Sequence, residues 1–200
     1  TRIGEEMEVP YANLNRIYQE SKAELDKAVK DCIDNSWFIK GPKVTEFENN
    51  LSTYCGAPAV GVSSGTSALL LAYECLGLKP GDKIIIPSFT FISTPEMASK
   101  LGLEIVWADC NKDNYTINTD ELAGILSSTK DIKAIVGVDI FGHTCDWDTI
   151  KNLAGDIPVV QDAAQSFGGK YKGRINGTYN DLTCFSFYPA KNMWCFGDGG

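Results

Sequence analysis

Hydrophobic residues follow two kinds of pattern along this chain. In some segments they recur at every third or fourth position, which is typical of the buried face of an amphipathic helix. In others they form short runs, such as IIIP at 84–87, that are typical of strands buried on both sides. The first pattern predicts helices at 17–34, 43–55, 63–78 (after an opening turn), 93–102, 118–128 and 146–155. The second predicts strands at 58–62, 83–87, 103–109, 133–142, 157–165 and 181–187.

Short apolar strands that alternate with helices indicate an α/β fold. We expect a mostly parallel central sheet with helices on both faces. No internal repeat, low-complexity tract or linker interrupts the pattern, so we expect residues 1–200 to behave as one unit. For the helix at 118–128, Asn118 or Thr119 is the expected N-cap and Glu121 lies in the first turn.

Composition and charge narrow the range of partners and cellular locations that this chain can have. The 200 residues are 44% hydrophobic and 22% charged, as in a globular chain with a substantial core. A formal net charge of −8 argues against nucleic acid or an anionic membrane as the main partner. No apolar run is long enough to span a bilayer, and the first residues, TRIGEEMEVPYANL, have no secretory apolar core. The cytosol is therefore the expected location.

Cysteine and histidine usage argues against metal chemistry. The seven cysteines include no C-x-x-C pair, so we expect reduced, mostly buried thiols rather than disulfides or a zinc site. His143 is the only histidine, which disfavours histidine-based metal sites and Ser-His-Asp catalysis.

Polar and aromatic residues follow the ends of the predicted strands. In parallel α/β folds, ligands gather at the point where strands end and helices begin. The residues at these positions are Ser63–Thr66, Ser88–Phe91, Phe141–His143, Asp162, Gln165, Ser186, Tyr188 and Lys191. A turn suited to phosphate, aromatic rings, a carboxylate and a lysine are thus expected at one edge of the sheet.

The segment SSGTSALLL, at 63–71, has the features of a phosphate site. It offers free backbone N–H groups, hydroxyls and the positive end of a helix dipole. Gly65 lets the backbone approach an anion closely. A plain Ser/Thr N-cap explains the same residues, and the segment is neither a P-loop nor a GxGxxG motif.

Asp162 and Lys191 are the two charged residues that the pattern singles out. Asp162 follows the apolar run IPVVQ, where a carboxylate needs a partner. A helix N-cap or a structural ion pair would also explain it. A lone lysine is usually exposed, but Lys191 lies among aromatic residues with no other charge between 182 and 197. A desolvated lysine has a lowered pKa and becomes an amine nucleophile and base.

These groups together match the requirements of pyridoxal 5′-phosphate (PLP). Its phosphate binds at a helix N-terminus, and a carboxylate keeps the pyridine nitrogen protonated. An aromatic ring stacks on the cofactor, and a lysine forms the Schiff base.

Six segments carry a resemblance to a known family, and they extend over nearly the whole chain. They are WFIKGPKVTEFE (37–48), VSSGTSALLLA (62–72), GDKIIIPSFTFISTPEM (81–97), FGHTCDWD (141–148), DAAQSFGGKYKGR (162–174) and CFSFYPAKNMWCFGDGG (184–200). The sequence resembles the sugar aminotransferases of the DegT/DnrJ/EryC1/StrS group, PLP enzymes of the aspartate aminotransferase fold (fold type I). The spacing from DAAQ to FSFYPAKN is also similar.

The resemblance implies roles for individual residues around the cofactor ring. Lys191 corresponds to the Schiff-base lysine and Asp162 to the partner of the pyridinium nitrogen. Gln165 is similar to the polar contact with the ring face or phenolic oxygen. Phe91, rather than Phe89, corresponds to the stacking aromatic residue.

Around the phosphate, the resemblance implies contacts from the turn that contains Ser64, Gly65 and Thr66. Gly65 and Thr66 would bind through backbone and hydroxyl, and Ser186 would add a second hydroxyl. The chain departs from the family at Trp194, where small residues are common, so the local loop is expected to differ. Family members are also much longer, which implies that residues 1–200 are an incomplete large PLP-binding domain without the small C-terminal domain.

The implied reaction moves an amino group from an amino acid, expected to be glutamate, to a keto group of a nucleotide-linked sugar. It would serve amino-sugar or cell-surface polysaccharide biosynthesis, in a homodimer whose subunits share active-site residues. Three alternatives remain at this point. Related PLP-dependent sugar dehydratases have histidine in place of Lys191, a non-enzymatic binding or regulatory domain is possible, and a Rossmann dehydrogenase lacks its glycine fingerprint here.

Overall fold

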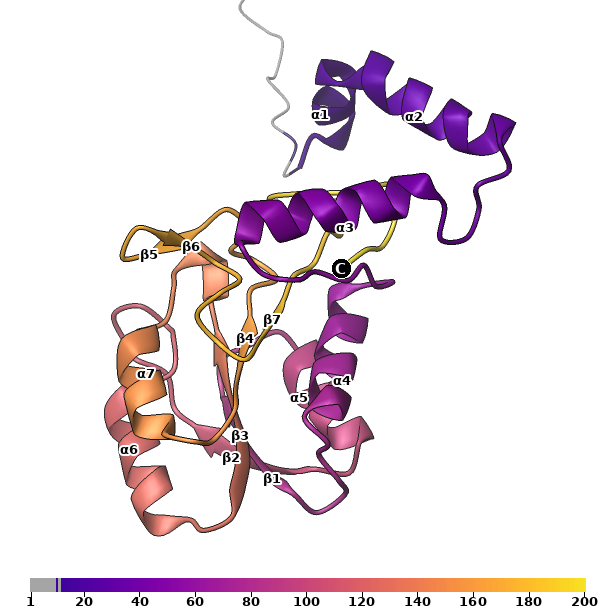
Figure 1. The fold of residues 1–200 in the computed structure, drawn as a ribbon. Helices are drawn as coiled ribbons and strands as arrows, with labels where there is room; N and C mark the ends of the chain where they lie inside the picture. The colour runs from indigo at the N-terminus through magenta and orange to yellow at the C-terminus, as the bar shows by residue number, and fades with distance from the viewer. Residues whose placement is uncertain (1–9, 11) are drawn as a thin grey trace, which may run out of the picture. The chain divides into compact units, whose positions relative to one another are not determined.

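The computed structural model describes Pro10 and residues 12–200 (Figure 1). The chain divides into two compact units, one ending at Glu46 and the other spanning Phe47–Gly200. The boundary falls within α3 (Pro42–Cys55). The hydrophobic pattern gave no sign of it, because the apolar positions of this helix continue without interruption.

The first unit contains two helices where the sequence predicted one at 17–34. They are α1 (Leu14–Glu20) and α2 (Lys22–Asp34). Ser21 separates them with φ −122° and ψ 16°, and its N–H donates to the carbonyl of Tyr18. The apolar periodicity continues through this break, which is why the sequence pattern did not reveal it.

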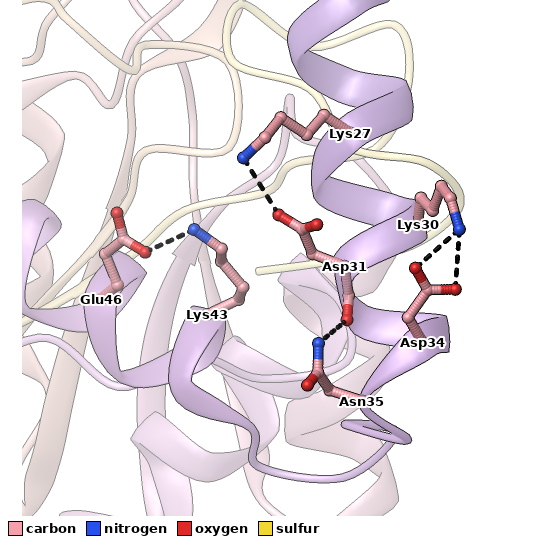
Figure 2. A network of polar contacts seen from close by, with 7 residues as sticks. All are labelled: Lys27, Lys30, Asp31, Asp34, Asn35, Lys43 and Glu46. Atoms are coloured by element: carbon pink, nitrogen blue, oxygen red, sulfur yellow. Dashed lines mark hydrogen bonds and ion pairs between the residues drawn. The ribbon is translucent and has the colours of Figure 1, made fainter.

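Ion pairs between neighbouring turns support α2, as Figure 2 shows. Lys27 Nζ lies 3.3 Å from Asp31 Oδ2, and Lys30 Nζ lies 2.6 Å from Asp34 Oδ2. Exposed pairs at this spacing contribute only about 0.2–0.5 kcal/mol each. No residue of α1 or α2 is buried, so apolar packing within the unit adds little to these helices.

The second unit is built on five parallel strands in the order β2-β1-β3-β4-β7. The strands are β1 (Lys83–Pro87), β2 (Glu104–Ala108), β3 (Ile132–Val138), β4 (Val159–Asp162) and β7 (Leu182–Cys184). In register, Val138 pairs with Asp162, and Asp162 with Cys184. The carboxyl ends of these strands therefore meet at one edge, and the predicted parallel sheet is confirmed.

Helices cover both faces of this sheet, as predicted (Figure 1). Alternate strand residues point to opposite sides, as a pleated strand requires. Ile84 and Ile86 join the cluster that includes Tyr73 of α4 (Gly65–Cys75) and Met97 of α5 (Ser93–Lys100). On the other face, Ile85 joins the cluster formed with α6 (Thr119–Ser128) and α7 (Trp147–Ala154). Among the described residues, no helix combines the length and apolarity needed to cross a bilayer.

A third apolar cluster supports the chain that leaves β7. It joins Leu51 and Cys55 of α3 to Ala163, Phe185 and Phe187. The rings of Phe47 and Phe187 meet edge to face, with centroids 5.4 Å apart. The strand-like residues after Cys184 are therefore fixed by side-chain packing, although the ladder itself ends at that residue.

The predicted strand at 58–62 does not form. The backbone N–H groups there are taken by side chains of α3: Ala59 donates to Ser52 Oγ at 2.9 Å and Gly61 to Glu48 Oε1 at 2.9 Å. Only Val62 makes a strand-like pair, exchanging two hydrogen bonds with Gly200.

A short hairpin that the sequence pattern did not predict follows β4. It consists of β5 (Lys170–Tyr171) and β6 (Arg174–Ile175), paired antiparallel. Lys172 and Gly173 connect them with φ values of 48° and 84°. Two successive positive φ angles are the signature of a type I′ turn, whose twist matches a two-residue hairpin.

Candidate active site

A cavity of about 510 Å³ lies beside the carboxyl ends of the strands. Its lining includes every residue that the sequence analysis proposed as a ligand: Ser64, Gly65, Thr66, Phe91, Asp162, Gln165, Ser186 and Lys191. Segments far apart in the sequence thus supply one site.

The strand order explains why the cavity forms there. From β1 the chain crosses to β2 on one side, and it then returns past β1 to β3 on the other side. Connections that diverge from adjacent strands leave a crevice outside their carboxyl ends, where ligands of open α/β sheets bind. Phe91 follows β1 and Ile140 follows β3, and both line the cavity.

One end of the cavity has the properties of an anion cradle, formed by Ser64, Gly65, Thr66 and Ser186. Ser64 caps α4, and its Oγ accepts a hydrogen bond from the N–H of Ser67 at 3.0 Å. Thr66 Oγ1 lies 2.8 Å from Ser93 Oγ. The N-terminal N–H groups and dipole of α4 favour a negative charge at this position.

Gly65 is required by the closeness of Ser186. A Cβ on Gly65 would lie 2.7 Å from Ser186 Cβ and 3.2 Å from Ser186 Oγ. A side chain at this position would therefore displace one of the predicted hydroxyl ligands from the cradle. The glycine serves close packing here, and its backbone φ is not in the left-handed region.

Asp162 presents a buried carboxylate to the cavity. Its residue is only 4% exposed, Thr94 Oγ1 donates to Oδ2 at 2.7 Å, and the N–H of Ala164 donates to Oδ1 at 3.1 Å. Burial raises the pKa of this carboxyl group, although both hydrogen bonds and the charge of Lys191 act in the opposite direction. A cation placed in the cavity would favour its ionised form.

Lys191 is half-buried in the loop after β7. Its backbone N–H donates to the carbonyl of Tyr188, and this hydrogen bond closes a turn around Pro189. Phe187 bonds through its backbone to both Cys195 and Gly199, so the loop is closed at its base. Burial lowers the pKa of the Lys191 ammonium, and the charge of Asp162 partly opposes this shift. The neutral amine therefore forms more readily than in an ordinary lysine.

Gln165 and the aromatic residues occupy distinct places. Gln165 Oε1 accepts a hydrogen bond from the backbone N–H of Phe141 at 2.6 Å. Phe91 lines the cavity. Phe89 instead packs against Tyr115 and Phe141, with ring centroids 5.6 Å and 6.0 Å away. This geometry agrees with the choice of Phe91 over Phe89 for stacking, a role that stays a prediction.

Sequence reasoning did not select several polar residues at the site. Ser93, Asp139 and Asp198 line the cavity, and Thr94 lies behind Asp162 as its hydrogen-bond donor. Asp139 carried a signal, since it is the one charged residue within the apolar run IVGVDIF. Thr94 carried none, because its partner is distant in sequence.

Comparison with known proteins places this chain among described relatives. Residues 19–200 match the DegT/DnrJ/EryC1/StrS aminotransferase family. The dTDP-3-amino-3,4,6-trideoxy-alpha-D-glucose transaminase of Streptomyces venezuelae is 38% identical over 195 residues, which cover 96% of this chain and 51% of the relative.

Two solved structures share the fold. The structure of S. venezuelae DesV in complex with a ketimine intermediate matches with a TM-score of 0.91 and 37% identity, covering 96% of this chain and 52% of that one. The Escherichia coli GDP-4-keto-6-deoxy-D-mannose-3-dehydratase with bound hydrated PLP matches with a TM-score of 0.81 and 27% identity, covering 86% and 46%. The chain spans about half the length of the relatives it matches. On the match over residues 19–200, it belongs to the DegT/DnrJ/EryC1/StrS aminotransferase family.

Proposed function

We propose that the protein carrying this chain is a PLP-dependent aminotransferase. It would transfer an amino group from an amino acid, which we propose is glutamate, to a keto group of a nucleotide-linked sugar. The observation that carries this proposal is that one cavity is lined by the anion cradle, the buried carboxylate of Asp162 and Lys191, whose pKa is lowered. The family membership and the transaminase relative support it.

The residues present fit the cofactor. The anion cradle offers hydroxyls and helix N–H groups to a phosphate, and Gly65 leaves the space beside Ser186 that a side chain would fill. Asp162 is a buried carboxylate whose two hydrogen bonds leave it able to accept a further donor. A protonated ring nitrogen would supply such a donor together with a positive charge, which favours the ionised carboxylate.

When bound, PLP supplies an aldehyde that condenses with amines and an electron-withdrawing ring. Asp162 would hold the ring nitrogen protonated, and Phe91 would cover the ring. Lys191 would bind the cofactor and then act as a base, because its lowered pKa makes the neutral amine, which can accept a proton at Nζ, easier to form than in an ordinary lysine. The same atom would return that proton to a neighbouring carbon of the substrate.

The sugar dehydratase alternative is weaker for this chain. The resemblance associates histidine with the dehydratases at the position of Lys191, and the chain has lysine there. An amine at this position can bind the cofactor covalently as well as move a proton. Transamination is therefore the reaction that we propose.

We also propose that residues 1–200 form the large cofactor-binding part of a longer protein, and that the protein is a homodimer. The first part is supported by the relatives, because this chain covers only about half of their length. The second is supported by apolar side chains of the first unit, since Ile33, Phe38 and Ile39 are 59%, 73% and 88% exposed. Exposed apolar surface of this kind marks an interaction site.

The function is tested in the full-length protein with added PLP. Borohydride reduction should fix a pyridoxyl group on Lys191 Nζ, located by mass spectrometry, and the K191A variant should show no such adduct. With glutamate and a panel of keto nucleotide sugars, a new amine should appear on the sugar by NMR. A pyridoxyl adduct on another lysine, or dehydration without amine transfer, would contradict the proposal.

A further inference from the structure

A second buried carboxylate, Asp139, lies at the carboxyl end of β3. It is fully buried, and its carboxylate accepts four hydrogen bonds. The N–H of Cys145 donates to Oδ1 at 3.0 Å. Gln161 Nε2, Ser166 Oγ and Asn176 Nδ2 donate to Oδ2 at 2.7 Å, 3.0 Å and 3.1 Å. Burying a carboxylate costs free energy unless such donors surround it. Packing alone therefore does not explain why an aspartate and its four donors lie at this position.

The side-chain donors come from three segments, two of which also supply residues to the cavity lining. Gln161 belongs to β4, Ser166 to the turn after β4, and Asn176 directly follows β6. The turn at 163–166 is closed by a hydrogen bond from the N–H of Ser166 to the carbonyl of Ala163, at 3.0 Å. Asp139 therefore binds the last residue of the turn that carries Gln165.

Both partners of the Gln165 contact lie next to residues that are linked to Asp139. The donor of that contact is the N–H of Phe141, two residues after Asp139, and Phe141 has φ 55°, which is unfavourable for a residue with a side chain. The acceptor, Gln165 Oε1, precedes Ser166, which Asp139 holds directly. The Asp139 carboxylate thus bonds next to both sides of this contact, to Ser166 after Gln165 and to the N–H of Cys145 at the end of the segment that contains Phe141.

We propose that Asp139 is a positioning residue, which holds the turn at 163–166 so that Gln165 stays on the Phe141 amide and faces the cofactor. The inference rests on the proposed function for the identity of the ligand. Asp139 acts through Gln165 and does not take part in the chemistry.

A structural role in the fold alone would give a different pattern of mutant effects. Gln161 also accepts a hydrogen bond from Thr183 Oγ1 at 3.2 Å, and neither residue of this bond belongs to the turn at 163–166. T183V therefore removes a bond of the same network without touching the turn. It is the matched control for D139N and for S166A, which removes one hydrogen bond to the same carboxylate.

The first measurement is hydrogen exchange of the Phe141 amide in the full-length protein without cofactor. D139N and S166A should lose the protection of this amide, as Q165A does, while T183V and the core amides of β3 keep theirs. Unchanged Phe141 protection in folded D139N and S166A would overturn the inference whatever the protein catalyses.

The second measurement is the PLP dissociation constant, obtained by titration. D139N should raise it about tenfold, as expected for losing hydrogen bonds to a charged group, and should have little further effect in a Q165A background. If D139N does not fold, S166A carries the same comparison. Additive effects of D139N and Q165A would contradict action through Gln165. Failure of the wild-type protein to bind PLP would refute the proposed function, and the exchange experiment would still show whether Asp139 holds the turn.

Discussion

At the scale of single residues, the cavity depends on how little space lies beside Gly65. The missing Cβ leaves room for Ser186, whose Cβ would otherwise be 2.7 Å away. Gly124, in α6, provides a contrast, because a Cβ there would have no neighbour within 4 Å. The two glycines thus occur in helices for different reasons: Gly65 for close packing, and Gly124 without a steric requirement.

We predict opposite effects of alanine at these two positions. G65A should lower the free energy of unfolding by about 1–3 kcal/mol through overpacking and should also weaken PLP binding. G124A should raise the free energy of unfolding by about 0.5–1 kcal/mol, because alanine is the better helix former. Urea denaturation measures both changes, and a G65A protein as stable as wild type would contradict the close packing.

The pKa of Asp162 predicts a pH dependence of stability in the cofactor-free protein. Burial raises this pKa above its ordinary value of 3.8, so the folded state binds more protons than the unfolded state over the interval above that value. The contribution of Asp162 to stability therefore falls as pH rises through this interval. D162N removes the effect, so the stability of D162N relative to wild type should rise between about pH 4 and the raised pKa.

Asp181 is the control of opposite sign. Burial acts to raise its pKa, but hydrogen bonds from the Val159 N–H and Lys151 outweigh it, and the pKa is lowered. Its contribution is present above the ordinary value and is lost as pH falls through the lowered pKa. D181N should therefore be less stable than wild type at neutral pH and should approach it in acid. If the stabilities of D162N and D181N relative to wild type changed in the same direction with pH, the opposite pKa shifts assigned to these two carboxyl groups would be refuted.

At the scale of elements, helix caps separate stability from ligand binding. Asn118 caps α6, which packs on the opposite face of the sheet from α4. Its Oδ1 accepts hydrogen bonds from the N–H groups of Asp120 and Glu121. Ser64 caps α4 within the anion cradle. N118A and S64A should each cost about 1 kcal/mol of unfolding free energy. Only S64A should also weaken PLP binding, as measured by titration.

The elements that the sequence predicted correctly are those whose own residues determine them. The sheet strands have apolar runs, and Asn118 is an N-cap as expected from its position before α6. The strand at 58–62 failed because Ser52 and Glu48, on another element, take its N–H groups. The hairpin β5–β6 was missed because two residues per strand are too few for a hydrophobic pattern.

The candidate site followed the same division. Its eight proposed ligands follow strand ends or belong to recognisable motifs, and all of them line the cavity. The supporting contacts were not predictable, since Thr94 meets Asp162 and Asn176 meets Asp139 only after the chain has folded. A local pattern shows which residue types lie at the site, and distant partners set their orientation.

At the scale of the whole molecule, the proposed dimer gives a prediction about the first unit. I39D introduces a charge at a position that is 88% exposed and should not disturb folding of the chain. If this apolar surface forms the contact between copies, I39D should shift the full-length protein toward monomer in sedimentation velocity. V60D, at an exposed apolar position of the second unit, should leave the dimer intact. Monomeric wild-type protein at micromolar concentration would contradict the proposal.

The closed loop that carries Lys191 has a consequence for sequence variation. Backbone hydrogen bonds fasten its base through Phe187, Cys195 and Gly199, and the side chains of Met193 and Cys195 pack against the apolar cluster that contains Phe187. Backbone bonds do not depend on side-chain identity, so the exposed Asn192, and Trp194, which is in none of the three apolar clusters, can change while the lysine stays in place. Trp194, whose ring packs against Phe196 with centroids 5.6 Å apart, fits this freedom. Positions 192 and 194 are accordingly where natural divergence, or a combinatorial library, can alter the loop next to Lys191 without moving its amine.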